Sequence, residues 1–134
     1  MNEKSYIKVS DVMTVSIKTI DATATVSEAI TLMREAGVSS LVTERRDKSD
    51  EYGLVVVSDI AKLVIAENRS PDRVNVYEIM TKPVLAVAGE MNIRYAVRML
   101  VQFGLSRALV VDVHRVPVGI VSLRDLVLRH AKDD

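Results

Sequence analysis

Two octapeptides in this chain resemble each other: GIVSLRDL at residues 119–126 and GLVVVSDI at residues 53–60. Each begins with a glycine, continues as an apolar strand and places an aspartate, Asp125 or Asp59, where a helical stretch opens. The likeness extends upstream, because DVMT at residues 11–14 returns as EIMT at residues 78–81, and GVSSL at 37–41 returns as GLSRA at 104–108. Both of these pairs are 67 residues apart. The chain is therefore a tandem duplication, and a period of this length predicts two similar supersecondary units.

The duplication sets the expected domain organisation. We assign residues 8–67 to a first repeat, residues 68–73 to a connector that contains Pro71, and residues 74–131 to a second repeat. A unit of about 60 residues buries only about 60% of the surface that its unfolded chain exposes. Each repeat is therefore expected to need the other, which predicts one pseudo-symmetric module.

Composition excludes several classes of function. The 18 basic and 18 acidic residues cancel, which gives no electrostatic reason to expect nucleic acid or an anionic membrane as the main partner. The chain has no cysteine, so disulfides, thiol nucleophiles and zinc sites built on sulfur are excluded. No segment reaches the roughly 18 uninterrupted apolar residues of a membrane span. We expect a cytoplasmic protein.

Hydrophobic periodicity predicts the same order of elements in both repeats. The elements expected in the first repeat are a helical turn over 9–13, a strand over 15–20, a helix between a Thr25–Glu28 capping box and Gly37, strands over 40–43 and 52–57, and a closing helix over 59–67. Those expected in the second are a turn over 74–80, a strand over 84–87, a helix over 92–103 ended by Gly104, strands over 108–113 and 118–121, and a closing helix over 125–132. The predicted fold class is α+β.

The strand-to-helix turn at residues 121–125 carries the chemical cue. A helix N-terminus exposes amide donors and the positive end of the helix dipole, and both favour an anion such as phosphate. The hydroxyl of Ser122 can donate to phosphate, and the carboxylate of Asp125 can accept from two adjacent hydroxyls, as a ribose offers. The pair suggests a nucleotide. The alternative is that Ser122 or Asp125 only caps the helix, since both are preferred N-cap residues.

The other polar residues have simpler interpretations. The charged run at residues 44–51 is typical of a solvated hairpin loop, with a binding patch as the alternative. His114 and His130 are too isolated for a metal site or a catalytic base, and the methionines are interpreted as packing residues. One basic face is interpreted as solvated or as part of a subunit contact, with room for an anionic partner: Arg94, Arg98, Arg124 and Arg129.

The order of elements, given twice, with DVMT at the head of one repeat and GIVSLRD at the tail of the other, resembles a tandem pair of CBS domains. Such a pair is also called a Bateman module, and the resemblance covers about Val9 to His130. It implies an α/β-type CBS fold in which two pseudo-symmetric β-α-β-β-α repeats pack through their small sheets. It also implies regulation without catalysis and without a required cofactor or metal. Members of the family usually regulate attached or partner proteins by binding AMP, ADP, ATP or S-adenosylmethionine in clefts between the repeats.

The resemblance implies two ligand clefts of unequal quality. In the main cleft, Ser122 would bind phosphate and Asp125 ribose, while Arg107 either approaches the phosphate or lies on the surface. The residues that the first repeat would supply to this cleft are Met13, Thr14, Val15 and Ser16 near the base, with Val38, Ser39 and Ser40. The weaker cleft would consist of Asp59, Thr81, Lys82, Pro83, Leu105 and Ser106.

The weaker cleft departs from the family pattern at one position. Val56 stands where the family has a serine or threonine. A net hydrogen bond to a charged group is worth about 1.5 to 3 kcal/mol, so its loss predicts binding that is roughly tenfold or more weaker.

Together these features predict a regulatory module that senses an adenine nucleotide or S-adenosylmethionine and modulates a partner protein of unknown identity. An apolar fraction of 49% predicts that helix faces, such as those of residues 59–67 and 125–130, meet in a homodimer. A nucleotide-dependent hydrolase or transferase is disfavoured, because Asp59 and Asp125 lack a nearby histidine, an acidic pair or a phosphate-binding glycine and lysine loop. A nucleic-acid-binding or structural interaction protein with a vestigial nucleotide cleft is the alternative.

Overall fold

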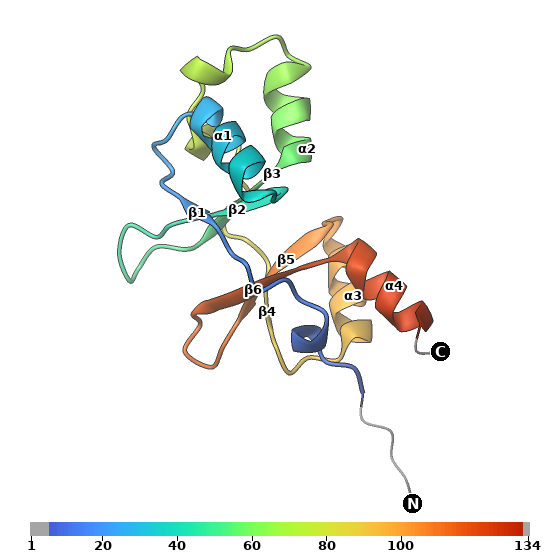
Figure 1. Cartoon of the computed structure of the whole chain (residues 1–134). Coiled ribbons are helices and arrows are strands. Elements are labelled where there is room, and N and C mark those ends of the chain that lie inside the picture. The colour runs from blue at the N-terminus through green and yellow to red at the C-terminus, as the bar shows by residue number, and fades with distance from the viewer. Residues whose placement is uncertain (1–5, 133–134) are drawn as a thin grey trace, which may run out of the picture. The chain divides into compact units, whose positions relative to one another are not determined.

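The computed structural model describes residues 6–132, which form two compact units (Figure 1). Unit 1 combines the described residues up to Ile17 with those from Leu85 onward, and unit 2 runs from Lys18 to Val84. These boundaries cut across the repeats of the sequence. The opening segment of each repeat, residues 9–17 or residues 74–84, belongs to the unit that the other repeat mainly builds.

Unit 2 contains a three-stranded sheet in the order β1-β2-β3. Its strands and helices are β1 (Thr19–Ile20), α1 (Val26–Ala36), β2 (Ser40–Thr43), β3 (Gly53–Val56) and α2 (Val57–Ile60), which continues as a π-helical turn over Ala61–Ile65. Two 3-10 turns follow, Pro71–Arg73 and Val76–Glu78. β1 runs parallel to β2, and β2 runs antiparallel to β3. The strand expected over residues 15–20 is shorter than predicted, because the chain passes from unit 1 to unit 2 after Ile17.

Unit 1 repeats this plan with the sheet order β4-β5-β6. Its elements are a 3-10 turn at Val9–Asp11, β4 (Ala86–Ala88), α3 (Ile93–Phe103), β5 (Arg107–Val111), β6 (Pro117–Ser122) and α4 (Leu123–Lys132). β4 pairs parallel to β5, and β5 pairs antiparallel to β6. The closing helices α2 and α4 both begin two residues earlier than predicted, directly at the end of a strand. The mixed α+β architecture is confirmed.

Local signals in the sequence explain the two central helices. The Thr25 hydroxyl accepts from the Glu28 amide at 3.1 Å, and the Glu28 carboxylate accepts from the Thr25 amide at 2.8 Å, which confirms the capping box. Asn92 caps α3 by accepting from the Arg94 amide at 2.9 Å. Gly37 and Gly104 end the helices with φ values of 67° and 65°, a left-handed conformation that glycine adopts without steric cost.

The opening segments complete the sheets and the cores of the units that they join. Thr14 and Ile120 exchange two backbone hydrogen bonds of 2.8 and 2.9 Å, so the first segment pairs with the outer edge of β6. Leu54 and Thr81 do the same on β3, with two bonds of 2.9 Å. Val9, which is fully buried, lies in the core of unit 1, and the residues that the other segment adds to the core of unit 2 are Val74, Val76 and Ile79.

The close approach of the first segment requires the glycine of the GIVSLRDL motif. A Cβ atom on Gly119 would lie 2.5 Å from Met13 Sδ and 3.0 Å from the Thr14 carbonyl oxygen. Gly53 occupies the same place in unit 2, where a Cβ atom would clash first with Thr43 Oγ1 of β2 and would lie 3.2 Å from both Met80 Sδ and the Thr81 carbonyl oxygen. The opening segment therefore leaves no room for a side chain at Gly119, and at Gly53 the neighbouring strand β2 and the opening segment together exclude one.

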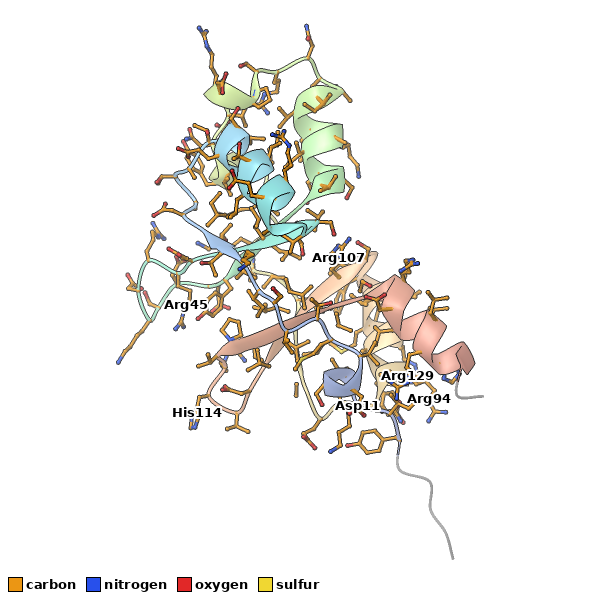
Figure 2. All side chains as sticks on the ribbon, viewed as in Figure 1. Asp11, Arg45, Arg94, Arg107, His114 and Arg129 are labelled. Atoms are coloured by element: carbon orange, nitrogen blue, oxygen red, sulfur yellow. The ribbon has the colours of Figure 1, made fainter. Side chains whose placement is uncertain are left out.

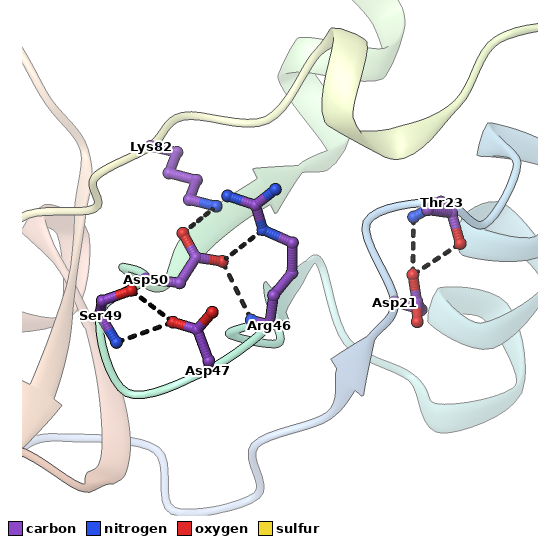
Figure 3. A network of polar contacts seen from close by, with 7 residues as sticks. All are labelled: Asp21, Thr23, Arg46, Asp47, Ser49, Asp50 and Lys82. Carbon is purple, nitrogen blue, oxygen red and sulfur yellow. Dashed lines mark hydrogen bonds and ion pairs between the residues drawn. The ribbon is translucent and has the colours of Figure 1, made fainter.

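The charged loop between β2 and β3 is mostly exposed, but the side chain of Asp50 is not. Arg45 places its guanidinium 4.7 Å from the ring centroid of Tyr52, and both are solvent-accessible (Figure 2). The side chain of Asp50, in contrast, is only 8% exposed. Its Oδ2 accepts from the Arg46 amide at 3.0 Å and from Arg46 Nε at 3.2 Å, and its Oδ1 lies 2.7 Å from Lys82 Nζ (Figure 3). Asp50 thus fastens the loop to the opening segment that contains Lys82.

The ion pair with Lys82 lowers the pKa of Asp50. The ammonium of Lys82, followed by the Arg46 amide, holds the pKa of the Asp50 carboxyl well below its usual range. A carboxyl whose pKa is lower in the folded than in the unfolded protein stabilises the fold above the unfolded pKa, which is about 3.9. That contribution disappears as the pH falls through the folded pKa.

We predict that Gly119→Ala destabilises unit 1, because its new methyl group meets Met13 and the backbone of Thr14. Overpacking of this kind costs about 1–3 kcal/mol in the free energy of unfolding, which urea denaturation followed by circular dichroism would measure. The cost should be smaller when Met13→Ala is already present. A variant with wild-type stability, within about 0.5 kcal/mol, would contradict the packing assigned to Gly119.

We also predict that Asp50→Asn lowers the free energy of unfolding at pH 7, and that the difference from wild type shrinks below about pH 4. Denaturation curves between pH 3 and pH 8 would check both parts. Asp47→Asn is the matched control, because the pKa of Asp47 is also lowered but by hydrogen bonds from Ser49 and the Asp50 amide, which lie inside the same loop and do not fasten it to another segment. A difference between Asp50→Asn and wild type that stays constant down to pH 3 would show that the carboxylate charge is unimportant.

Candidate functional site

Three polar side chains lie together in unit 1, at the carboxyl end of β6. Arg107 opens β5 and stands opposite Ser122 in the antiparallel register. Opposed residues of such a pair project from the same face of the sheet, with Cβ atoms about 4.5–5.5 Å apart. Asp125 follows in the first turn of α4, and all three residues are partly exposed. Figure 2 shows Arg107 at the start of its strand. A guanidinium, a hydroxyl and a carboxylate are thus available to solvent at one corner of this unit.

Ser122 serves as the helix cap and keeps a free donor. Its Oγ accepts from the Asp125 amide at 3.1 Å, so Ser122 caps the helix, as one of the two interpretations expected. A hydroxyl that accepts one hydrogen bond still has its own proton to donate, so capping and phosphate binding are compatible. The Leu123 amide already donates to the Ser106 carbonyl at 2.8 Å. Because two amides of the first turn are engaged, the positive charge for an anion comes mainly from Arg107.

Asp125 remains accessible to hydroxyl donors. Its side chain is 44% exposed, and its Oδ1 lies 3.5 Å from Arg124 Nη1, on a side chain that is 80% exposed. An exposed ion pair of this kind contributes little energy, since water and salt screen it. The carboxylate can therefore exchange this contact for the two adjacent hydroxyls of a sugar.

The opening segment supplies further residues of the predicted main site to the same unit. Met13 packs against Gly119, and Thr14 pairs with Ile120 on the free edge of β6. Val15, whose side chain is 71% exposed, and Ser16, also exposed, follow along the chain. Unit 1 therefore contains seven of the residues predicted for the main site: Met13, Thr14, Val15, Ser16, Arg107, Ser122 and Asp125. Val38, Ser39 and Ser40 belong to unit 2, where Ser40 is buried with 7% exposure.

Unit 2 repeats the backbone of this corner with different side chains. Ser40 stands opposite Val56 in the antiparallel register, at the positions that correspond to Arg107 and Ser122. The Val57 amide donates to the Ser39 carbonyl at 3.0 Å, as Leu123 does to Ser106. Val56 has no side-chain hydrogen bond to the helix that it precedes. The carboxylate of Asp125 has a counterpart in unit 2, which is the carboxylate of Asp59. The guanidinium of Arg107 and the capping hydroxyl of Ser122 have no counterpart there.

The remaining residues of the predicted weaker site divide between the units. Thr81 pairs with Leu54, Lys82 is bound to Asp50, and Pro83 is exposed after a cis peptide bond. Leu105 and Ser106 belong to unit 1. Sequence reasoning missed Asp50, because a carboxylate in a run of eight mostly charged residues carries no signal of a partner 32 positions away.

The described residues offer little for metal chemistry. His114 lies exposed at the tip of the β5–β6 hairpin (Figure 2), and His130 lies exposed on α4. Between residues 6 and 132, no three side chains of histidine, cysteine, aspartate or glutamate are grouped so that they could hold a metal ion. In the same part of the chain, every helix is too short or too polar to cross a membrane.

Comparison with known proteins identifies the scaffold. The model of the CBS domain family matches residues 9–66 and 76–131. An uncharacterized protein of Methanopyrus kandleri is 30% identical over 121 residues, which cover 90% of this chain, and this chain spans 61% of that relative's length. The hexameric CBS-CP12 protein from bloom-forming cyanobacteria superposes with a TM-score of 0.90 at 33% identity, covering 94% of this chain and 69% of that one.

Two solved structures share the fold at lower identity and contain bound ligands. One is the CBS domain pair of protein MJ0100 in complex with 5′-methylthioadenosine and S-adenosyl-L-methionine, with a TM-score of 0.80, 22% identity and coverage of 97% of this chain and 100% of that one. The other is a CBS domain protein from Pyrobaculum aerophilum complexed with AMP, with a TM-score of 0.77, 21% identity and coverage of 94% and 99%. Because the family model matches both halves of the chain, this protein belongs to the CBS domain family and contains two CBS domains.

Proposed function

We propose that this protein is a regulatory module that senses an adenine nucleotide and thereby modulates a partner protein. The observation that carries the proposal is the placement of Arg107 opposite Ser122, with Asp125 one turn further on. A guanidinium binds phosphate through two parallel hydrogen bonds, and the serine hydroxyl adds a third donor. The carboxylate accepts from the two hydroxyls of the ribose. AMP and S-adenosylmethionine, the ligands of proteins with the same fold, both contain that ribose.

The other residues of the main site are assigned to the base. Val15 offers an exposed apolar side chain in a polar neighbourhood, which suits the face of an adenine ring. Thr14 and Ser16 offer hydroxyls for its edge. We give Met13 the same role, and we assign Asp59, Thr81, Lys82 and Pro83 of unit 2 to a second, weaker site.

The proposed role is regulation by binding and not catalysis. A ligand regulates only if its affinity differs between two states of the protein, and the difference in affinity limits how far the equilibrium moves. The groups assigned to the site bind and orient a nucleotide, but none of them is arranged to activate a nucleophile. The partner that reads the ligand state would be a cytoplasmic protein.

We further propose that the protein is a homodimer. Large apolar side chains are exposed on the closing helices of both units: Val57, Leu63 and Ile65 after β3, and Val127 and Leu128 on α4. Their exposed fractions lie between 39% and 56%, and exposed apolar side chains on a helix suit a protein–protein contact.

A second candidate function has one observation in its favour. The guanidinium carbons of Arg94 and Arg98 lie 5.5 and 5.4 Å from the ring centroid of Tyr95, whose side chain is 45% exposed. An exposed aromatic ring between two arginines can stack on a base and bind phosphates, so single-stranded nucleic acid is the alternative ligand. That function would leave the nucleotide site vestigial.

We predict that AMP, or another of ADP, ATP and S-adenosylmethionine, binds with micromolar affinity, and that Asp125→Ala abolishes this binding. The variant loses two hydrogen bonds to a charged group, about 1.5–3 kcal/mol each, which lowers affinity by roughly a hundredfold or more. Isothermal titration calorimetry would measure both proteins. Asp59→Ala, the matched change in unit 2, should leave the stronger binding event intact. If none of the four ligands binds, the nucleotide-sensing function is wrong, and salt-dependent binding to RNA becomes the test of the alternative.

We also predict that light scattering at micromolar concentration gives the mass of a dimer, and that Leu128→Glu shifts the mass toward the monomer. The new carboxylate would have to lose its hydration in an apolar contact. Val113→Glu is the control, because Val113 is 92% exposed at the tip of the β5–β6 hairpin. A wild-type monomer, or equal effects of the two substitutions, would count against an interface on α4.

A further inference from the structure

The helices α1 and α3 are corresponding copies, 67 residues apart in the chain, and their buried sides match. The residues that are buried at corresponding positions are Val26, Ala29 and Met33 in α1 and Ile93, Ala96 and Leu100 in α3. Packing within each unit therefore makes the same demand on both helices. A difference between their outer sides needs another explanation.

The outer side of α3 consists of residue types that are typical of protein interfaces. Its exposed residues Arg94, Tyr95, Arg98 and Val101 are here called the α3 surface. Residues three or four positions apart on a helix are neighbours, so these four side chains form one patch. Tyrosine and arginine are enriched where proteins meet, whereas serine and glutamate are depleted. The corresponding residues of α1 are Ser27, Glu28, Thr31 and Arg34.

The first turn of α3 lacks interactions that stabilise the start of a helix. In α1, Glu28 completes a capping box with Thr25. Asn92 caps α3, but Tyr95 stands where a glutamate would complete the box, so the first turn contains no acidic residue. Arg94 also places a cation near the positive end of the helix dipole, which is unfavourable. Residues that break a local rule without a gain in packing are expected at functional positions.

The two guanidinium groups of the α3 surface have no carboxylate partner among residues 6–132. Helix α3 has no acidic residue of its own, and the carboxylate of Glu90, just before the helix, lies 3.3 Å from Lys8 Nζ. The guanidinium carbons of Arg94 and Arg98 lie over the ring of Tyr95 instead. A guanidinium that is stacked on a ring keeps N–H donors at its edge for a carboxylate. The complementary partner therefore carries carboxylates.

A segment of another protein fits this surface better than nucleic acid or a second copy of the chain. Two guanidinium groups already occupy positions over the ring of Tyr95, where a base would stack, and two cations neutralise few phosphates. Val101, whose side chain is 65% exposed, adds an apolar contact that a phosphate backbone does not use. The α3 helix of a second copy would bring further arginines and no carboxylate.

We propose that the α3 surface is the docking site for the regulated partner, which binds through a segment that combines carboxylates with apolar side chains. The carboxylates bind Arg94 and Arg98, and the apolar side chains cover Tyr95 and Val101. The inference rests on the proposed function, in that a partner protein is taken to read the ligand state. It locates the partner on unit 1, the unit that contains Arg107, Ser122 and Asp125.

The probe for this surface is a short labelled peptide of alternating glutamate and leucine pairs, titrated with the full chain and followed by fluorescence anisotropy. We expect it to bind more tightly than a peptide with lysine in place of glutamate, and more tightly than a single-stranded RNA oligonucleotide. Arg98→Glu should weaken binding of the acidic peptide roughly tenfold or more, because the new carboxylate repels those of the probe. Thr31→Glu, the corresponding change on α1, is the matched control and should leave this binding unchanged.

Three results of this titration would overturn the inference. The first is that the acidic peptide does not bind, and the second is that Arg98→Glu and Thr31→Glu have equal effects. The third is that RNA binds more tightly than the acidic peptide and loses affinity in Arg98→Glu, which would assign the α3 surface to nucleic acid.

A second substitution separates docking from folding. Tyr95→Glu supplies the missing member of a capping box with Asn92, so we expect urea denaturation to shift to a higher midpoint. The same change removes the ring and adds a repelling charge, so binding of the acidic peptide should fall roughly tenfold or more. A lower midpoint would show that Tyr95 serves the fold, and unchanged peptide binding would show that it does not serve docking. Either result would overturn the inference.

Further outcomes separate the docking site from the other proposals. If AMP binds through Asp125 but the acidic peptide does not bind, nucleotide sensing stands and the docking site is wrong. If the peptide binds through Arg98 in a protein that binds no nucleotide, the docking site stands and nucleotide sensing is wrong. A shift of Arg98→Glu toward the monomer in light scattering would assign the α3 surface to a contact between copies and overturn the inference.

Discussion

The structure depends on the backbone pairing between the opening segment of each repeat and the outer strand of a sheet built by the other repeat. Thr14 closes the edge of β6, and Thr81 closes the edge of β3, each through two hydrogen bonds. The pairing buries Val9 and Val76 completely, in the cores of unit 1 and unit 2. It also satisfies strand edges that would otherwise be open to other chains. Neither repeat contains all the parts of one unit, which explains why a duplication of such short repeats yields a single interdependent fold.

This arrangement separates the residues that hold the fold from those that determine the chemistry. Gly53 and Gly119 are alike because neither position has room for a side chain, next to Thr43 and the opening segment in unit 2 and next to the opening segment in unit 1. The paired positions Ser40–Val56 in unit 2 and Arg107–Ser122 in unit 1 have no such constraint. Either polar or apolar side chains are compatible with the strand register there. The two copies have therefore diverged there, to arginine and serine in one unit and to serine and valine in the other.

A regulatory role of the kind proposed requires that the ligand bind one state of the protein more tightly than another. The fold requires no catalytic machinery for this role, because binding energy alone shifts the populations. Each unit places a carboxylate, Asp59 or Asp125, in the first turn of its closing helix, and the neighbouring strand positions differ in polarity between the units.

The sequence by itself determined the duplication, the fold class and the local geometry of the helices. The capping box at Thr25 and the glycine ends of α1 and α3 depend on neighbours within a few residues, so they could be predicted from spacing. The apolar pattern of each opening segment could not decide which unit it joins, because it would suit either of two similar cores, and only the family resemblance pointed to the closing turn of the other repeat. The register that sets Arg107 opposite Ser122, and the ion pair of Asp50 with Lys82, were likewise decided only by tertiary structure. They join residues that are distant in the chain, and only packing selects which of many chemically equivalent partners meet.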